Sequence, residues 1–161
     1  MDPLYEEKYH ERERNYWWFK ARREAIYKLL NFYNIKYNSK ILDIGCSSGL
    51  LLEELYQHGY PKNNLYGIDI SKDAVNIAKS NGFENVQIMD GSELTFKNES
   101  MDVIISSDSL EHIKWDKTAL KQWHQCLRPG GMLVVFVPAF NCLWSEHDEI
   151  NSRSLIVLLN Y

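Results

Sequence analysis

The sequence has few cysteines and prolines, and it has no long apolar run. Its 161 residues include three cysteines and four prolines. The widely spaced cysteines Cys46, Cys126 and Cys142 predict neither a disulfide framework nor a zinc site, so we expect no bound metal. No apolar run approaches the ~20 residues that a membrane-spanning helix needs. Residues 1–18 also have no apolar core typical of a secretion signal. We therefore expect a reduced, cytoplasmic protein that does not act at a membrane.

The sequence also has no excess of basic charge. Its formal net charge is −4, which argues against a nucleic-acid-binding protein. The charge is uneven, because residues 1–40 hold nine basic and six acidic side chains, whereas the remainder holds nine basic and sixteen acidic ones. The N-terminal part should therefore be attracted to the rest of the chain.

The length and the absence of a linker predict one domain over residues 1–161. Within it we expect an N-terminal helical arm or lid (1–37), a binding core (38–139) and a short C-terminal segment (140–161). Hydrophobic residues make up 45% of the chain and charged residues 25%, which is typical of a globular protein.

Apolar stretches rich in Ile, Val and Leu alternate with stretches of helical periodicity. This alternation predicts βαβ units and an α/β fold with a parallel sheet covered by helices on both faces. The first expected helix, 16–34, has apolar residues at helical spacing, namely Trp18, Ala21, Ala25, Leu29 and Phe32. The other expected helices are 49–58, 71–81 and 117–127, the last of them broken by Pro129-Gly130-Gly131, and the expected strands are 41–45, 65–70, 85–89, 101–106 and 132–137.

Acidic residues follow several of the expected strands, at the edge of the sheet where ligands bind in open α/β folds. The first strand leads into Asp43-Ile-Gly45-Cys-Ser47-Ser-Gly49, a turn in which glycines allow close approach of backbone to a ligand. Asp69 ends the second strand, where a carboxylate can accept hydrogen bonds from both hydroxyls of a ribose. A helix cap is the alternative for Asp69, but Ser71 already fits that role.

The charges around this turn indicate the kind of nucleotide. No basic residue lies in the turn, which disfavours a triphosphate, and Asp43 would repel a pyrophosphate but suits an amino group. Asp90, after the third strand, offers an acceptor to the amino group of adenine. A ligand with an adenine, a ribose and a cationic amino-acid tail satisfies all three carboxylates, and S-adenosylmethionine is such a ligand.

Four segments in the same order and spacing resemble the class I S-adenosylmethionine-dependent methyltransferases, which have a Rossmann-like fold. The segments are ILDIGCSSG (41–49), YGIDIS (66–71), IMDGSELTFKNESMDVIISSDSLEHI (88–113) and LRPGGMLVVFVPA (127–139). The stretches YWWFKARR (16–23) and PAFNCLWSEHDE (138–149) resemble a subgroup that acts on small molecules. The resemblance implies a small-molecule substrate and S-adenosylmethionine as cofactor.

The same resemblance implies a role for single residues. Asp43 would lie near the ammonium of the amino-acid tail, Asp69 would hold the ribose, and Ile70 would pack on the adenine. Asp90 would meet the adenine amino group, with Gly91 beside it. The backbone of the first turn would line the tail and the ribose through Gly45, Cys46, Ser47 and Gly49, with Ser47 in place of the glycine that is common there.

Further positions have an expected role, and several of them have an alternative as well. Ser107 would face the methionine portion of the cofactor, and Arg22 would meet either its carboxylate or an acidic side chain in a surface salt bridge. His112 and His147 are candidate catalytic bases, with packing in a turn as the alternative for His112. For the aromatic residues we favour packing in a core or lid over stacking on a substrate; these are Trp17, Trp18, Phe19, Trp115, Trp123 and Trp144.

The C-terminal part departs from the family pattern of seven strands. We expect the sheet to be shortened after about the fifth strand, which would leave that strand as an exposed apolar edge. Residues 154–159 (SLIVLL) fit a replacement strand, a short helix or a sticky end. We expect the edge to be covered by these residues or by a second copy of the chain, as in a homodimer.

Methyl transfer to a small molecule is the function that the sequence favours. The shortened C-terminal part favours one alternative, a catalytically inactive cofactor-binding or partner subunit. A nicotinamide oxidoreductase is less consistent with Asp43 and Asp90.

Overall fold

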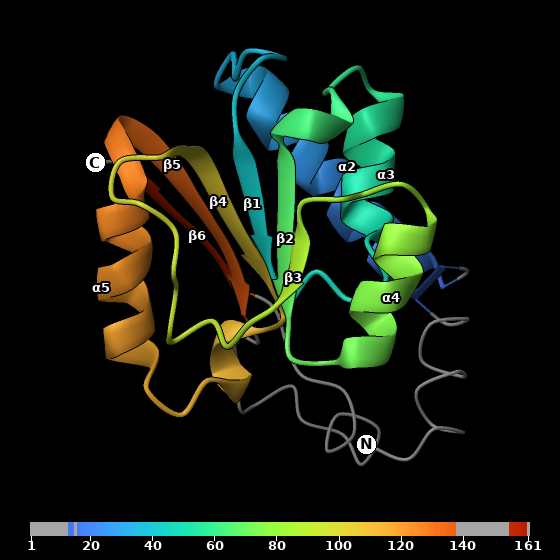
Figure 1. Cartoon of the computed structure of the whole chain (residues 1–161). Coiled ribbons are helices and arrows are strands. Elements are labelled where there is room, and N and C mark those ends of the chain that lie inside the picture. The colour runs from blue at the N-terminus through green and yellow to red at the C-terminus, as the bar shows by residue number, and fades with distance from the viewer. Residues whose placement is uncertain (1–12, 15, 138–154, 161) are drawn as a thin grey trace, which may run out of the picture.

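The computed structural model describes residues 13–14, 16–137 and 155–160 (Figure 1). These residues contain one six-stranded sheet with the strand order β3-β2-β1-β4-β5-β6. The first five strands in the chain are parallel and β6 is antiparallel to β5. The strands are β1 (Ile41–Ile44), β2 (Leu65–Asp69), β3 (Val86–Ile88), β4 (Met101–Ser107), β5 (Leu127–Val137) and β6 (Leu155–Asn160).

Helices cover both faces of the sheet, as the sequence predicts. Figure 1 shows α5 on one face and α2, α3 and α4 on the other. The α-helices are α2 (Trp17–Phe32), α3 (Leu50–Gln57), α4 (Lys72–Ser80) and α5 (Asp116–Cys126), and two short 3-10 helices are η1 (Lys62–Asn64) and η2 (Leu110–His112).

Two apolar layers form the core because side chains alternate along each strand. On β1, Ile41 joins the layer that contains Ile26 of α2 and Leu52 of α3. Leu42 and Ile44 point to the opposite face and join the layer that contains Trp123 of α5. The alternation places Asp43 on the same face as Ile41, which is the face covered by α2 and α3.

The buried face of α2 differs from the sequence prediction by one position. Arg22, Ile26 and Leu30 are buried, whereas Trp18 and Phe32, two of the residues expected on the core face, are exposed. Both sets have helical spacing, so periodicity did not separate them. Arg22 was not expected on the buried face because it is charged, and an arginine is rarely buried unless another part of the fold supplies a partner.

The aromatic predictions are confirmed in part. Trp123 is buried and its indole N–H donates to the carbonyl of Gly91 at 2.7 Å. Trp17 and Trp18 are 66% and 42% exposed, and Trp115 is exposed too, so packing in a core is wrong for these three. Phe19 is half-buried, and the guanidinium of Arg22 lies over its ring, 5.0 Å from the centroid. Trp144 lies outside the described residues.

The apolar edge of β5 is covered by the same chain. Met132–Val137 pair in antiparallel register with Leu155–Asn160, from Met132 opposite Asn160 to Val137 opposite Leu155. Of the sequence alternatives, the replacement strand is therefore confirmed. A second copy is not needed to pair this edge. The strand β5 also begins earlier than expected, because residues 127–131 continue it through the Pro-Gly-Gly segment.

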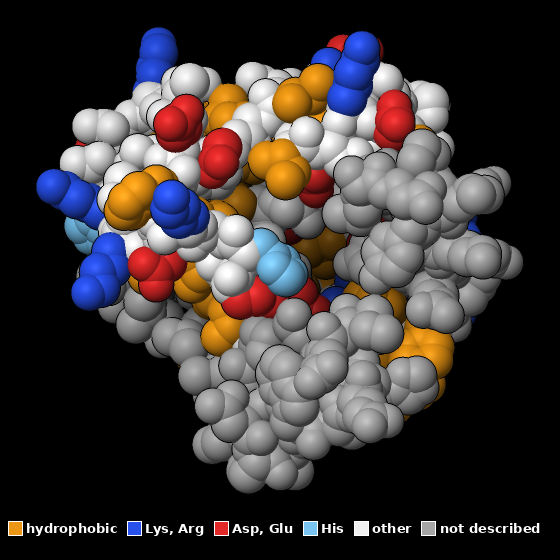
Figure 2. Space-filling model, turned by 90° about the horizontal axis from the view of Figure 1, so that it is seen from below, with side chains coloured by type: hydrophobic (Ala, Val, Ile, Leu, Met, Phe, Trp, Pro, Cys, Tyr) orange, Lys and Arg blue, Asp and Glu red, His pale blue; other side chains and the backbone are white. Residues whose placement is uncertain are grey.

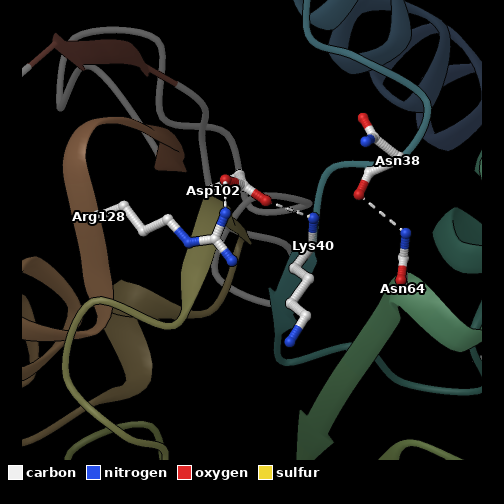
Figure 3. A network of polar contacts seen from close by, with 5 residues as sticks. All are labelled: Asn38, Lys40, Asn64, Asp102 and Arg128. Carbon is white, nitrogen blue, oxygen red and sulfur yellow. Dashed lines mark hydrogen bonds and ion pairs between the residues drawn. The ribbon is translucent and has the colours of Figure 1, made fainter.

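Polar contacts tie the strands together at the amino end of the sheet (Figure 3). The carboxylate of Asp102 accepts hydrogen bonds from the backbone N–H of Lys40 and from Nη1 of Arg128, each at 2.7 Å. The amide of Asn64 donates to the carbonyl of Asn38 at 2.9 Å. These contacts connect the residues at the starts of β1, β2, β4 and β5.

None of the helices that the structure describes is long and apolar enough to cross a membrane.

Candidate functional site

The expected site residues gather at the carboxyl ends of β1, β2 and β4. Figure 2 looks onto this face, where acidic side chains and a histidine border a hollow with hydrophobic atoms at its floor. Asp43 and Asp69 lie in β1 and β2 themselves. The loops that follow the strands supply the neighbouring groups: residues 45–49 after β1, 70–71 after β2 and 108–112 after β4.

The turn after β1 is tight, and backbone hydrogen bonds connect it to β2. The backbone N–H groups of Gly45 and Cys46 both donate to the carbonyl of Ile68, at 2.8 and 3.0 Å. The turn uses three left-handed residues, Gly45 (φ 76°), Ser47 (φ 47°) and Gly49 (φ 82°). Glycine adopts this conformation without strain, so Ser47 stands at a position where glycine is the easier choice.

The two glycines also allow close packing. A Cβ atom on Gly45 would lie 2.5 Å from Cβ of Ser109, and one on Gly49 would lie 3.1 Å from Cβ of Ala78. Gly45 thus lets the turn pass against the loop after β4, and Gly49 lets α3 begin beside α4. From the sequence, Gly45 was expected to allow close approach of a ligand; in the structure it is needed for the fold as well.

Cys46 is a packing residue in the turn. Its side chain is buried, and its Sγ lies 2.8 Å from the position of a Cβ on Gly67 of β2. Burial, with the nearby charges of Asp43 and Asp69, raises the pKa of its thiol well above the ordinary value. A neutral, buried thiol is not reactive, which agrees with a role for the Cys46 backbone alone.

Asp69 joins the two loops at the centre of the face. Its Oδ2 accepts from the backbone N–H of Ser47 at 2.8 Å, and its Oδ1 accepts from the backbone N–H of Ser71 at 2.8 Å. The helix cap of α4 is Ser71, whose Oγ accepts from the N–H of Ala74 at 3.2 Å. The capping alternative for Asp69 is therefore wrong. Each carboxylate oxygen has a second lone pair for a ligand hydroxyl.

Asp43 is a buried acid in the last part of β1, not on the turn itself as the sequence suggested. Its side chain is 3% exposed and makes no hydrogen bond with any of the described residues. Burial, followed by the negative charges of Glu13 and Asp69, raises its pKa to about 8. A buried carboxyl without a partner is costly, and a cation beside it would remove the cost.

The structure places Asp90 and Ile70 at the outer part of the same face. Asp90 lies just after β3, and its Oδ1 accepts from the N–H and the Oγ of Ser92, both at 2.7 Å, which lowers its pKa. Asp90 therefore remains ionised near neutral pH. Ile70 is 75% exposed and offers an apolar side chain directly after Asp69 in the chain.

Close packing explains why a glycine is found at position 91. A Cβ at this position would lie 2.8 Å from Cδ1 of Ile113 and 3.0 Å from Cγ2 of Ile44. Gly91 is buried below the surface that bears Asp90, so its place in the fold is explained by packing and by the hydrogen bond to Trp123.

Arg22 reaches the site from α2 and forms an ion pair with Asp108, the first residue after β4. Their side chains are 8% and 18% exposed, so this pair is not the surface salt bridge that the sequence left open. Asp108 has a φ of 52°, which turns the chain sharply at the strand end. Ser107, half-buried, immediately precedes it and is the last residue of β4.

The loop after β4 presents Glu111 and His112 at the rim. Oγ of Ser109 donates to the carbonyl of Ile44 at 2.7 Å and lies 2.7 Å from Oγ of Ser106, which fixes the start of this loop on β1. Glu111 and His112 follow in η2 and are exposed. Partial desolvation raises the pKa of Glu111, although the charges of His112 and Arg22 act in the opposite direction. The other histidine candidate, His147, lies outside the described residues.

Two residues of this face, Glu13 and Asp108, were not predicted from the sequence. Glu13 comes from the N-terminal arm, and its Oε2 accepts from Oγ of Ser47 at 2.8 Å. The sequence around Asp108 does not indicate that this residue pairs with an arginine. Both contacts join segments far apart in the chain, and no spacing rule would have found them.

A second hollow is lined by residues of the helical layer. It has a volume of about 470 Å³ and is a groove between α2 and α3. The ion pair between Arg23 and Glu54 spans this groove at 2.7 Å. Its lining is Lys20, Arg23, Glu24, Tyr27, Lys28, Glu54 and His58.

Comparison with known proteins identifies the family. Residues 42–135 match a family model described as a methyltransferase domain. A ubiquinone biosynthesis O-methyltransferase of Coxiella burnetii is 29% identical over 130 residues, which cover 73% of this chain and 54% of the relative. A ubiquinone/menaquinone biosynthesis C-methyltransferase of Campylobacter jejuni is 31% identical over 71% of this chain and 50% of the relative.

Solved structures of methyltransferases are similar to this chain as well. The S-adenosylmethionine-dependent methyltransferase of Mesorhizobium loti is similar with a TM-score of 0.56 and 25% identity, over 62% of this chain and 46% of that protein. The chain spans about half the length of the curated relatives it matches. By its sequence match and its parallel sheet, the chain belongs to the class I S-adenosylmethionine-dependent methyltransferases.

Proposed function

We propose that the protein transfers a methyl group from S-adenosylmethionine to a small-molecule acceptor. The observation that carries the proposal is the set of carboxylates at adjacent strand ends, with Asp69 held between two backbone N–H groups at 2.8 Å. The buried carboxyl of Asp43, which makes no hydrogen bond with the described residues, fits the ammonium group of the cofactor. Family membership supports the same cofactor.

Each part of the cofactor has a matching group in this chain. Asp69 accepts hydrogen bonds from the ribose hydroxyls, and its fixed position lowers the entropy that binding costs. Ile70 packs on the adenine, and Asp90 accepts from the adenine amino group. The backbone of Gly45, Cys46, Ser47 and Gly49 lines the tail, and Ser107 faces the methionine portion. Arg22, already paired with Asp108, positions α2 over the site.

The bound cofactor supplies an electrophilic methyl group on a positively charged sulfur. An acceptor atom attacks the methyl carbon in line, the carbon–sulfur bond breaks with its electron pair going to sulfur, and the acceptor loses a proton. The protein contributes proximity, orientation and exclusion of water. We assign the proton transfer to His112 at the rim of the site, with His147 as the second candidate base.

The acceptor is proposed to be a small molecule. The relatives from Coxiella burnetii and Campylobacter jejuni are named for the biosynthesis of quinones, which supports a small ring-containing acceptor. The net charge of −4 supports the absence of a nucleic-acid substrate.

Calorimetric titration with S-adenosylhomocysteine tests the cofactor site. The Asp69→Ala variant should bind about 1.5–3 kcal/mol more weakly, the size of hydrogen bonds to a charged group. Asp102→Ala is the matched control, because it removes an aspartate with two hydrogen bonds at the opposite end of the sheet. The control should lose stability but keep its affinity. Equal affinity in wild type and Asp69→Ala would contradict the ribose assignment.

Methyl transfer itself is measured with S-adenosylmethionine that carries a tritiated methyl group and a panel of small phenols, quinols and sugars. Labelled product supports the proposed activity. Tight cofactor binding without product on any acceptor would contradict it and favour a cofactor-binding subunit.

A further inference from the structure

Glu13 of the N-terminal arm lies against the glycine-rich turn, where no sequence motif placed it. Its Oε2 accepts a hydrogen bond from Oγ of Ser47 at 2.8 Å. Ser47 has a left-handed backbone, with a φ of 47°, and its own N–H donates to Asp69. Glu13 is therefore connected through one residue to the carboxylate assigned to the ribose.

The position of Glu13 is fixed from the other side by α2. Nη1 of Arg23 donates to the backbone carbonyl of Glu13 at 3.0 Å, and Nε of the same arginine donates to Oε2 of Glu54 on α3 at 2.7 Å. The side chain of Arg23 is 13% exposed, so this link between the arm, α2 and α3 is largely shielded from water. The contact of Glu13 with the turn is thus held by the framework.

Three carboxyl groups, those of Glu13, Asp43 and Asp69, meet at this turn. The charges of Glu13 and Asp69 both raise the pKa of Asp43, which is 3% exposed and makes no hydrogen bond to any described residue. Like charges around a buried carboxyl destabilise the protein unless a cation binds among them. The turn is also where the amino-acid tail of the cofactor falls in the proposed function, and the ammonium of that tail is such a cation.

We propose, on the basis of the proposed function, that Glu13 is a cofactor-binding residue whose carboxylate, together with Asp43, holds the ammonium group of the amino-acid tail. The oxygen of Ser47 positions Glu13 for this contact. The N-terminal arm then contributes directly to cofactor affinity, and it does so only for ligands that carry the amino-acid tail.

Two ligands separate this role from a structural one. S-adenosylhomocysteine carries the adenine, the ribose, the sulfur and the amino-acid tail, whereas 5′-methylthioadenosine lacks the tail. Their affinities are measured by calorimetry for the wild type, for Glu13→Gln and for Glu84→Gln. Glu84 is exposed and lies after α4, so its variant makes the same change of charge away from the turn.

In Glu13→Gln, the affinity for S-adenosylhomocysteine should fall about tenfold or more, and the affinity for 5′-methylthioadenosine should remain within twofold. Glu84→Gln should change neither. An unchanged or tighter affinity of Glu13→Gln for S-adenosylhomocysteine would overturn the proposal, and so would an equal loss for both ligands, which indicates a role in shaping the turn. Failure of the wild type to bind either ligand contradicts the proposed function instead, so the two failures are distinguishable.

Discussion

Replacement of Asp43 by asparagine should make the protein more stable and at the same time a weaker cofactor binder. The carboxyl is buried in β1, and its pKa is raised from 3.8 to about 8 by burial and by the charges of Glu13 and Asp69. Between these values the folded state keeps a proton that the unfolded chain releases. Unfolding therefore becomes easier as the pH rises through this window, and the penalty remains above it.

The magnitude follows from the size of the shift. Each pH unit within the window costs about 1.4 kcal/mol, so the wild type should lose about 3 kcal/mol relative to Asp43→Asn between pH ~5.5 and ~7.5. Urea denaturation at the two pH values measures this difference, and the other titrating groups cancel because both proteins share them. Equal changes in stability for the two proteins between these pH values would show that the pKa of Asp43 is not raised in the folded state.

Ligand binding provides the second half of this test. In the free protein near neutral pH, Asp43 is largely protonated because its pKa is about 8. Binding of an ammonium group favours the ionised form, so S-adenosylhomocysteine should displace a proton. Calorimetry in buffers of different ionisation enthalpy should detect this proton release in the wild type and not in Asp43→Asn, which should also bind about tenfold more weakly. Equal proton release in both proteins would show that Asp43 does not face the ligand.

Two further predictions concern the turn and the rim. Gly45→Ala should lower the stability by about 2–4 kcal/mol, because the new side chain combines a left-handed backbone with a close contact to Ser109. The control Gly130→Ala, with a similar φ of 78° and no atom within 4 Å of the new Cβ, should lower it by only about 1 kcal/mol. Equal losses for the two variants in thermal denaturation would contradict the role of the Ser109 contact. His112→Gln should lower kcat about 100-fold and leave the affinity for S-adenosylhomocysteine unchanged, whereas the control His124→Gln on α5 should leave kcat unchanged. An unaltered kcat in His112→Gln would exclude His112 as the base.

The sequence predicted those parts of the fold that depend on local patterns. The strands that end near Asp43, Asp69 and Asp90 were recognised because stretches rich in apolar, β-favouring residues lie next to turn residues in the chain. The cap of α4 at Ser71 was predicted for the same reason and is confirmed.

Features that depend on distant partners were not predicted. The buried face of α2 was assigned one position away because the sequence gives no sign that Arg22 pairs with Asp108, 86 positions later in the chain. The contact between Glu13 and Ser47 likewise joins residues that the chain brings together only after folding. For residues 154–159, the sequence left three alternatives, and the choice of a strand is explained by the unpaired edge that β5 offers.

The most direct test of the account is a crystal structure of the protein with S-adenosylhomocysteine. We predict that the ribose hydroxyls lie within hydrogen-bonding distance of Asp69, the adenine lies on Ile70 near Asp90, and the ammonium group lies beside Asp43. Density for the nucleoside in the groove between α2 and α3, or at the strand ends with its sugar away from Asp69, would contradict the account.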